Sequence, residues 1–370
     1  MKQYTVAAKR IIFTINNDPS TDQRMQRICG TLASNGYKVV LVGRTMTRLP
    51  LPELPYPAFR LNSWLRKGPL SYAEFNIRLF WWLLFRKTDI ICAIDLDTIL
   101  PVYINSKWKN IVRVYDAHEY FSELKEVVRR PAIQKIWQRI ESFSLQRFPL
   151  GYTVSQSIAE AFENRYGVRY TVIRNLPFRN KNEVPVTQRK KRFLYQGAIN
   201  EGRGIEQLLE AMLTVPAELD LYGSGNRLDA CKALCRSLGL QHKVFFHEPV
   251  PPETLRKLTP YYWAGINLVE PEGLNQLYSL ANKFFDYIQA GIPQVTMNFP
   301  EYQRVQQEQP VGILLGSTRS AEIARALNHL LEDTVVYEQL TENCRHASKT
   351  YCWENEEKHL LAVYQKISDK

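Results

Sequence analysis

The sequence predicts an α/β protein built of two tandem, doubly wound domains. At 370 residues the chain exceeds the size at which a single core usually stops growing. Apolar runs of strand length alternate with amphipathic helical patterns, which is typical of buried parallel strands joined by crossover helices. A polar stretch with two prolines, residues 177–191, interrupts this alternation of strands and helices and is typical of a linker. We therefore expect one domain on each side of it.

The first series begins with "RIIFTI", a helix from about Asp22 to Ser34, and "KVVLVG". Met25, Ile28, Cys29 and Leu32 share one face of that helix, so the segment predicts a β-α-β unit. Further strands are expected at "DIICAID", "IVRVYDAHE", "GYTV" and "YTVIRNLP", with helices at about 132–146 and 155–165.

The second series predicts strands at "RFLYQG", "ELDLYG", "KVFFHE", "AGINLV", "PQVTM" and "GILL", with helices at 205–213 and 227–237. A last helix, 354–367, carries apolar positions that need a docking surface, and we expect it to pack on the first domain. The predicted domains are thus 1–178 together with 353–370, and 179–352. Ligands of such sheets bind at the carboxyl ends of the strands, so the predicted site is a central cleft faced by both domains.

The net charge of +11 is unevenly distributed. Lys and Arg outnumber Asp and Glu by 12 in residues 1–178 and fall one short in 179–370. A basic half suggests an anionic partner such as a phospholipid face, a lipid pyrophosphate or nucleic acid, and the alternative is a solvated surface without a partner. The N-terminus lacks a signal-peptide pattern and the apolar run Leu79–Phe85 is too short to span a membrane, so we expect a cytoplasmic protein.

No metal site is expected. Cys231 and Cys235 lie four residues apart on a predicted helix without nearby ligands, and are interpreted as small apolar residues. The pair Asp95 and Asp97 has the spacing of metal-binding carboxylates, but Asp97 is interpreted as a helix N-cap before Ile99.

Two glycine-containing loops predict an anion site. Gly197 ends a strand, and Gly202, Arg203 and Gly204 precede a helix, so backbone N–H groups and a guanidinium share one end of the sheet. The alternative is a plain β-α turn with a surface arginine. Gly223 in "LDLYGSGNR" repeats the arrangement and allows close backbone approach. The glycines do not follow the G-x-G-x-x-G pattern, and no acidic residue lies at the distance in sequence at which dehydrogenases bind the ribose. Both observations disfavour a nicotinamide dehydrogenase.

The stretch "SLANKFFDYIQAGIP" carries charges of both signs at a helix start. Its free N–H groups and Lys283 suit a phosphate, whereas Asp286 suits the hydroxyls of a ribose. Together they indicate a nucleotide diphosphate, and the alternative is an ordinary helical ion pair. The predicted loop before the helix consists of Ser279, Leu280, Ala281 and Asn282.

The order "YQG…GRG", "LYGSG", "SLANKFFDYIQAGIP" resembles the donor domain of the retaining glycosyltransferases of family four (glycosyl transferases group 1), which have the GT-B fold. "DAHEYFSE" and "WENEEKHLLAVY" extend the resemblance over most of the chain. It implies that Arg203 and the loop 279–282 contact the donor pyrophosphate and that Asp286 holds the ribose. Tyr278 and Ala198 depart from the family's glutamate and arginine, so the alternative contacts of the donor sugar are Glu270 and Glu272.

In the first domain "VYDAHEYF" places Asp116, His118 and Glu119 just after a strand. The resemblance implies a histidine near the transferred sugar. A lone histidine is more often an ordinary hydrogen-bonded residue, but two adjacent carboxylates favour a catalytic site.

The expected function is a metal-independent retaining glycosyltransferase that uses no cofactor and acts on a glycan or lipid-linked acceptor. The segment Asn76–Lys87, "NIRLFWWLLFRK", is a candidate contact with an anionic membrane on the inner face, although a buried helix and a nucleic-acid contact are alternatives. The rival functions are a sugar-nucleotide epimerase, which needs no acceptor, and a basic nucleic-acid-binding protein, which predicts salt-dependent binding. The second half has a net charge of −1, which argues against nucleic acid as a partner.

Overall fold

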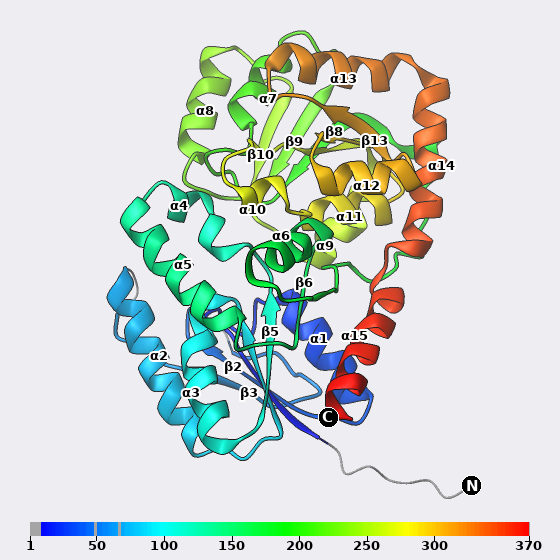
Figure 1. Ribbon diagram of the computed structural model, residues 1–370. Helices are drawn as coiled ribbons and strands as arrows, with labels where there is room; N and C mark the ends of the chain where they lie inside the picture. Colours follow the sequence, from blue (N-terminus) through cyan, green and yellow to red (C-terminus); the bar gives the residue numbers. More distant parts are fainter. Residues whose placement is uncertain (1–8, 48–49, 66–67, 370) are drawn as a thin grey trace, which may run out of the picture. The chain divides into compact units, whose positions relative to one another are not determined.

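The computed structural model describes residues 9–47, 50–65 and 68–369. The chain divides into two compact units, each described by itself below. The N-terminal unit runs to Arg174 and resumes at Glu356, and the C-terminal unit is Asn175–Asn355. Each unit is an open parallel sheet flanked by helices, so the predicted α/β fold class is confirmed (Figure 1).

The N-terminal unit contains a seven-stranded sheet of order β3-β2-β1-β4-β5-β6-β7. Every pairing in it is parallel. The sequence order reverses between β1 and β4, and such a reversal opens a crevice at the carboxyl ends of the two strands. The strands are β1 (Arg10–Thr14), β2 (Lys38–Arg44), β3 (Ala58–Leu61), β4 (Ile90–Ile94), β5 (Val112–Ala117), β6 (Gly151–Thr153) and β7 (Thr171–Val172).

The first helix forms as the sequence predicts. Asp22 is its N-cap, with Oδ1 accepting the Met25 N–H at 3.0 Å, and its predicted apolar face is buried. The helices of the unit are α1 (Gln23–Ser34), α2 (Pro69–Leu84), α3 (Ile99–Lys109), α4 (Lys125–Val128), α5 (Pro131–Leu145) and α6 (Gln156–Tyr166), with 3-10 helices η1 (Leu96–Thr98) and η2 (Phe121–Glu123).

The predicted N-cap role of Asp97 is wrong. The chain leaves β4 through η1, so Asp97 lies inside a 3-10 turn and Thr98 occupies the N-cap position of α3. Within the described residues, the Thr98 side chain makes no capping hydrogen bond to that helix.

The C-terminal unit repeats the plan with a six-stranded sheet of order β10-β9-β8-β11-β12-β13, and its order reverses between β8 and β11. Cys231 and Cys235 are free and buried in its core. The strands are β8 (Lys190–Gln196), β9 (Glu218–Tyr222), β10 (Val244–His247), β11 (Tyr262–Asn267), β12 (Gln294–Met297) and β13 (Gly312–Leu315). The helices are α7 (Ile205–Ala211), α8 (Leu228–Ser237), α9 (Pro252–Leu258), α10 (Leu274–Leu277), α11 (Asn282–Gln289), α12 (Pro300–Glu308), α13 (Ser320–Glu332) and α14 (Thr334–Thr350), with η3 (Val186–Gln188) and η4 (Thr259–Tyr261).

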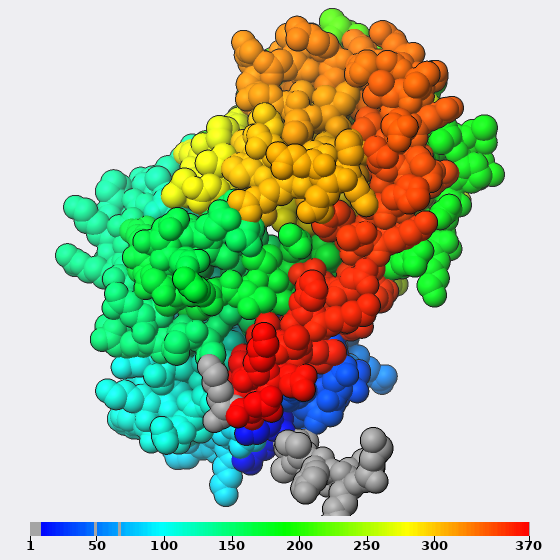
Figure 2. Space-filling view, turned by 45° about the vertical axis from the view of Figure 1, so that its right-hand side comes forward, coloured from blue at the N-terminus to red at the C-terminus, as the bar shows by residue number. Residues whose placement is uncertain are grey.

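The last helix, α15 (Trp353–Ser368), belongs to the N-terminal unit from Glu356 onward. Tyr364 is fully buried, with its ring centroid 6.0 Å from that of Phe13 and its hydroxyl 3.2 Å from that of Tyr152. Figure 2 shows this helix, in red, beside the blue N-terminal residues of the unit. The helix therefore supplies part of that unit's core. Across the described ranges, no helix is long and apolar enough to cross a membrane.

Candidate functional site

The predicted donor residues of the C-terminal unit lie at the carboxyl ends of β8, β9 and β11. The Gly197 N–H donates to Tyr222 O at 2.9 Å, and the Glu270 N–H donates to Gly202 O at 2.9 Å, so the three loops are joined through their backbones. A Cβ on Gly223 would lie 1.9 Å from Gly197 O, which only glycine avoids. These loops surround the point where the strand order reverses.

Arg203 lies in the turn between β8 and α7. Gly204, in the left-handed region with φ of 63°, is the N-cap of α7. Among the residues that the structure describes, no hydrogen bond or ion pair engages the Arg203 guanidinium. Its charge is thus available to an anion at the edge of the sheet.

Lys283 lies against the same edge. Its Nζ is 3.8 Å from the centroid of the Tyr195 ring, and a Cβ on Gly197 would be 3.5 Å from that nitrogen. Burial and then the charge of Arg203 hold the pKa of Lys283 well below its usual range, while Asp286 partly opposes them. Burial and the nearby Arg203 therefore both disfavour the protonated form of Lys283, and an incoming diphosphate would favour it.

Asp286 is anchored one turn into α11. Its Oδ2 accepts from Gln196 Nε2 at 2.9 Å, and Gln196 Oε1 accepts from the buried Thr259 hydroxyl at 3.4 Å. The carboxylate is therefore fixed to the end of the central strand β8, where a ribose hydroxyl can reach it.

Several groups of the loop 279–282 form hydrogen bonds or packing contacts within the C-terminal unit. The Ser279 N–H donates to Gln276 O at 3.4 Å, and the Ala281 N–H donates to the buried Tyr302 hydroxyl at 3.2 Å. Leu280 packs against the core, and Asn282 Oδ1 accepts from Asn175 Nδ2 at 2.7 Å. In the first turn of α11 the Phe284 N–H donates to Ala281 O at 3.0 Å, next to Lys283.

Glu270 and Glu272 follow β11 in one tight turn. The Glu272 N–H donates to Glu270 O at 2.8 Å, and both side chains are half-buried. Glu270 lies beside the loop that carries Arg203, because its N–H bonds to Gly202 O.

In the N-terminal unit, Asp116 is the centre of a buried network. Its two oxygens contact Arg24 Nη2 at 3.0 Å and His118 Nε2 at 2.9 Å, and Arg24 Nη1 donates to Ile173 O at 2.9 Å. Burial alone would raise the pKa of Asp116, but Arg24 and His118 hold it below its usual value. Burial would lower the pKa of His118, but the Asp116 carboxylate outweighs it and the pKa is raised. Asp116 is fully buried and is joined to the partly exposed His118 ring.

Asp95, at the end of β4, holds the turn that carries the histidine. Its Oδ1 accepts the His118 N–H at 2.8 Å and the Glu119 N–H at 3.2 Å. Its backbone lies in the left-handed region with φ of 54°, which is uncommon for aspartate. Burial raises the pKa of Asp95, and it raises the pKa of the neighbouring Asp97 to about 7. The Glu119 side chain is exposed.

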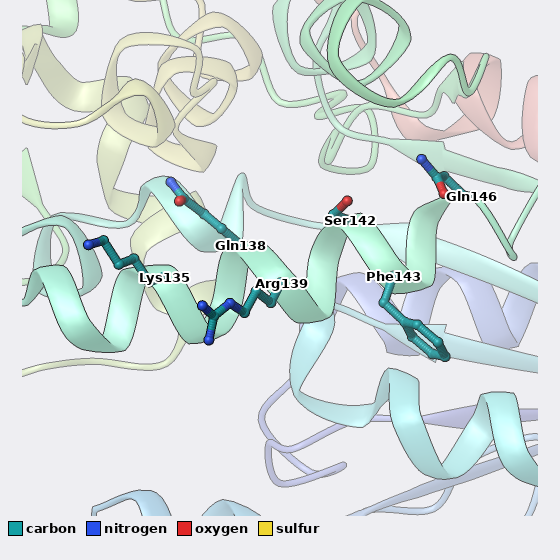
Figure 3. Close-up of a pocket in the computed structure, with 6 residues that line it drawn as sticks. All are labelled: Lys135, Gln138, Arg139, Ser142, Phe143 and Gln146. Atoms are coloured by element: carbon teal, nitrogen blue, oxygen red, sulfur yellow. The ribbon is translucent and has the colours of Figure 1, made fainter.

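The sequence reasoning missed Arg24, Asp95, Gln196 and Tyr302 as partners of these sites. An available signal was Arg24 itself, a charged residue next to Met25 and four positions before Ile28 on the apolar face of α1. It also missed a hollow along α5, which Figure 3 shows. Its lining is polar and cationic except for one ring, and consists of Lys135, Gln138, Arg139, Ser142, Phe143 and Gln146.

Comparison with known proteins covers both units. A family model described as "Glycosyltransferase Family 4" matches residues 23–176, and one described as "Glycosyl transferases group 1" matches residues 178–347. An uncharacterized glycosyltransferase of Methanocaldococcus jannaschii is 28% identical, over 90% of this chain and 91% of its own.

Solved structures show the same GT-B fold. Sucrose-phosphate synthase from Thermosynechococcus elongatus has a TM-score of 0.79 and 17% identity, covering 97% of this chain and 99% of that one. HepE of Anabaena, in complex with UDP and glucose, has a TM-score of 0.77 and 14% identity, covering 97% of this chain and 100% of that one.

Proposed function

Because this chain belongs to the group 1 glycosyltransferases of family four, we propose that it transfers a sugar from a nucleotide diphosphate donor to a hydroxyl acceptor, with retention of anomeric configuration. The acceptor is a glycan or a lipid-linked glycan on the cytoplasmic face of a membrane, as in the synthesis of cell-surface polysaccharide. HepE, a structural neighbour, binds UDP and glucose, which supports a nucleotide-sugar donor.

The observation that carries the proposal is the pair of cations at the edge of the C-terminal sheet. The Arg203 guanidinium has no hydrogen bond or ion pair among the described residues, and burial together with Arg203 lowers the pKa of Lys283, which supports a site that takes an added negative charge. A diphosphate leaving group develops negative charge as the glycosidic bond breaks, and fixed cations stabilise that charge. We assign this role to the two side chains and not to a metal ion. Each charge-assisted contact contributes about 1.5–3 kcal/mol.

The remaining residues take roles around the same donor. Asp286 accepts from the ribose hydroxyls, and Glu270 with Glu272 faces the transferred sugar. In the N-terminal unit we assign the catalytic role to His118, with Asp116 holding its ring and Glu119 beside it on the turn.

Thermal denaturation with UDP, GDP and ADP tests the donor site. At about 100 times the dissociation constant, a nucleotide that binds the folded state stabilises it by roughly 2.7 kcal/mol. One of the three should raise the melting temperature of the wild type, and Arg203→Ala and Asp286→Ala should each lose most of that shift.

The control is Arg236→Ala, in the last turn of α8 and away from the loops at the carboxyl edge. This variant should keep the full shift. The proposal would be contradicted if all three nucleotides left the wild type unchanged, or if Arg203→Ala responded as strongly as Arg236→Ala. Conversion of a nucleotide sugar to its isomer without an acceptor would favour an epimerase instead.

A further inference from the structure

The N-terminal unit exposes an apolar surface on α2 and α3. Five large side chains form it at helical spacing, and we call them the α2–α3 ridge. Their exposed fractions are 59% for Ile77, 54% for Trp81, 79% for Phe85, 40% for Ile104 and 68% for Trp108. Large apolar side chains that share one exposed face usually mark an interaction site.

The ridge is continuous across the two helices. Phe80 joins them, with ring centroids 5.5 Å from Trp81 and 5.9 Å from Trp108, and the Phe85 ring stacks on Trp81 at 6.5 Å. The helices lie side by side in Figure 1 and are locked by Asn105 Nδ2, which donates to Phe80 O at 3.2 Å. The ridge is thus a preformed feature of a rigid helix pair.

Cations flank the ridge and carboxylates are absent from its segments. Arg86, Lys87 and Lys107 are exposed and adjoin Phe85 and Trp108 in the sequence, and the Arg86 guanidinium lies 4.8 Å from the ring centroid of Trp82. Neither the segment 76–87 nor the segment 99–109 contains Asp or Glu. The hollow on α5 is also lined by cations, Lys135 and Arg139. It adjoins α3, because the ring centroids of Tyr103 on α3 and Phe143 on α5 are 5.4 Å apart.

We propose that the α2–α3 ridge docks the N-terminal unit on an anionic phospholipid surface. Aromatic rings next to Lys and Arg suit the headgroup region, where the rings enter the acyl boundary and the cations meet the lipid phosphates. A symmetric contact between two copies would instead bring these cations close to their own counterparts. The inference deepens the proposed membrane location, but lipid binding needs neither donor nor acceptor, so the two can fail separately.

Vesicle flotation tests the proposal. The full chain is mixed with phosphatidylcholine vesicles and with vesicles in which roughly a third of the lipid is phosphatidylglycerol. Wild type should float with the anionic vesicles, less so at high salt. The variant Trp81→Ser/Phe85→Ser/Trp108→Ser should lower the partition coefficient by at least about tenfold. Arg86→Gln/Lys87→Gln/Lys107→Gln should lower it similarly and remove the salt dependence.

The matched control is Leu213→Ser/Val335→Ser, which removes two exposed apolar side chains from the C-terminal unit. It should float like wild type, and circular dichroism should show that all variants are folded. The proposal is overturned if wild type does not float, if it prefers neutral vesicles, or if the ridge variant floats equally well. Dimers of wild type that the ridge variant abolishes, without vesicle binding, would assign the surface to a second copy.

Discussion

At the scale of single residues, the protonation state of Lys283 is expected to depend on whether the nucleotide is bound. Its pKa is lowered by burial and by Arg203, and a bound diphosphate would raise it again. Nucleotide binding should therefore take up a proton at pH values between the pKa of Lys283 in the free enzyme and its pKa in the complex, and affinity should fall as pH rises through that range.

Calorimetry between about pH 7 and 10 checks this linkage. Titrations in buffers of different ionisation enthalpy should report proton uptake by wild type and little by Lys283→Arg, whose guanidinium stays charged. Equal proton uptake by the two proteins would remove Lys283 from the diphosphate site.

His118 predicts a dependence of stability on pH. Its folded pKa is raised by Asp116, so the imidazolium stabilises the fold fully below the unfolded pKa, and this contribution is lost as pH rises through the folded pKa. The difference in free energy of unfolding between wild type and His118→Gln should be larger at about pH 6 than at about pH 9. Urea unfolding at both values measures it, and a difference that grows with pH would contradict the assigned pair.

The sequence predicted some site residues and not others for a physical reason. Arg203, Lys283 and Asp286 follow glycines or a helix start, so their type and local spacing already indicate an anion site. Arg24 and Asp95 act across 92 and 23 residues of sequence, on Asp116 and on the His118 backbone. Such pairings depend on the order of the strands in the sheet, which cannot be predicted from the pattern of neighbouring residues in the sequence.

At the scale of elements, the contact between Gly223 and Gly197 joins the loops after β8 and β9. Gly223→Ala places a Cβ 1.9 Å from Gly197 O, and it should destabilise the C-terminal unit by about 1–3 kcal/mol and weaken nucleotide binding. The control is Gly316→Ala, where nothing lies within 4 Å of the added Cβ. Urea unfolding of both compares them, and equal stability would mean that the two loops can separate without cost.

Asp95, after β4, is expected to position His118, to which we assign the catalytic role. Asp95→Ala removes the acceptor of two backbone N–H groups, so kcat should fall by about tenfold while the UDP-induced thermal shift is retained. Asp95→Asn keeps an oxygen acceptor and tolerates the left-handed backbone, and should restore most of the activity. A loss of UDP binding in Asp95→Ala, or no rescue by asparagine, would indicate a general structural role.

Element existence was easier to predict than element boundaries. The helix at 155–165 is α6, Gln156–Tyr166, with Ser155 as N-cap. The helix expected at 205–213 ends earlier, at Ala211. The strand β3 was not predicted, because "AFRL" is short, only half-buried and lies at the sheet edge. Edge strands carry little of the apolar signal on which the prediction depends.

At the scale of the whole molecule, every predicted nucleotide contact lies in the C-terminal unit. Hydrogen exchange should therefore slow in the loops at 197–204 and 279–286 when the stabilising nucleotide is added, and remain unchanged at 116–119. Mass spectrometry of peptides from the full chain resolves these regions. Protection confined to the N-terminal unit would place the nucleotide on the other sheet.

The two-domain α/β architecture was predictable because the alternation of strands and helices runs through the whole chain. The division after Arg174, rather than after 178, was not. The composition of the segment "NLPF" does not indicate to which unit it belongs. In the structure, Leu176 packs in the core of the C-terminal unit. Tertiary packing decides such boundaries.

The crossing of α15 from one unit to the other has a consequence for biosynthesis. A ribosome releases residues 175–355 before the segment that begins at Glu356, so the second sheet can be complete while the first still lacks Tyr364 between Phe13 and Tyr152. The N-terminal unit can therefore complete its core only after the segment from Glu356 onward has been synthesised. A stop codon placed just before Glu356 would therefore destabilise the unit that was translated first.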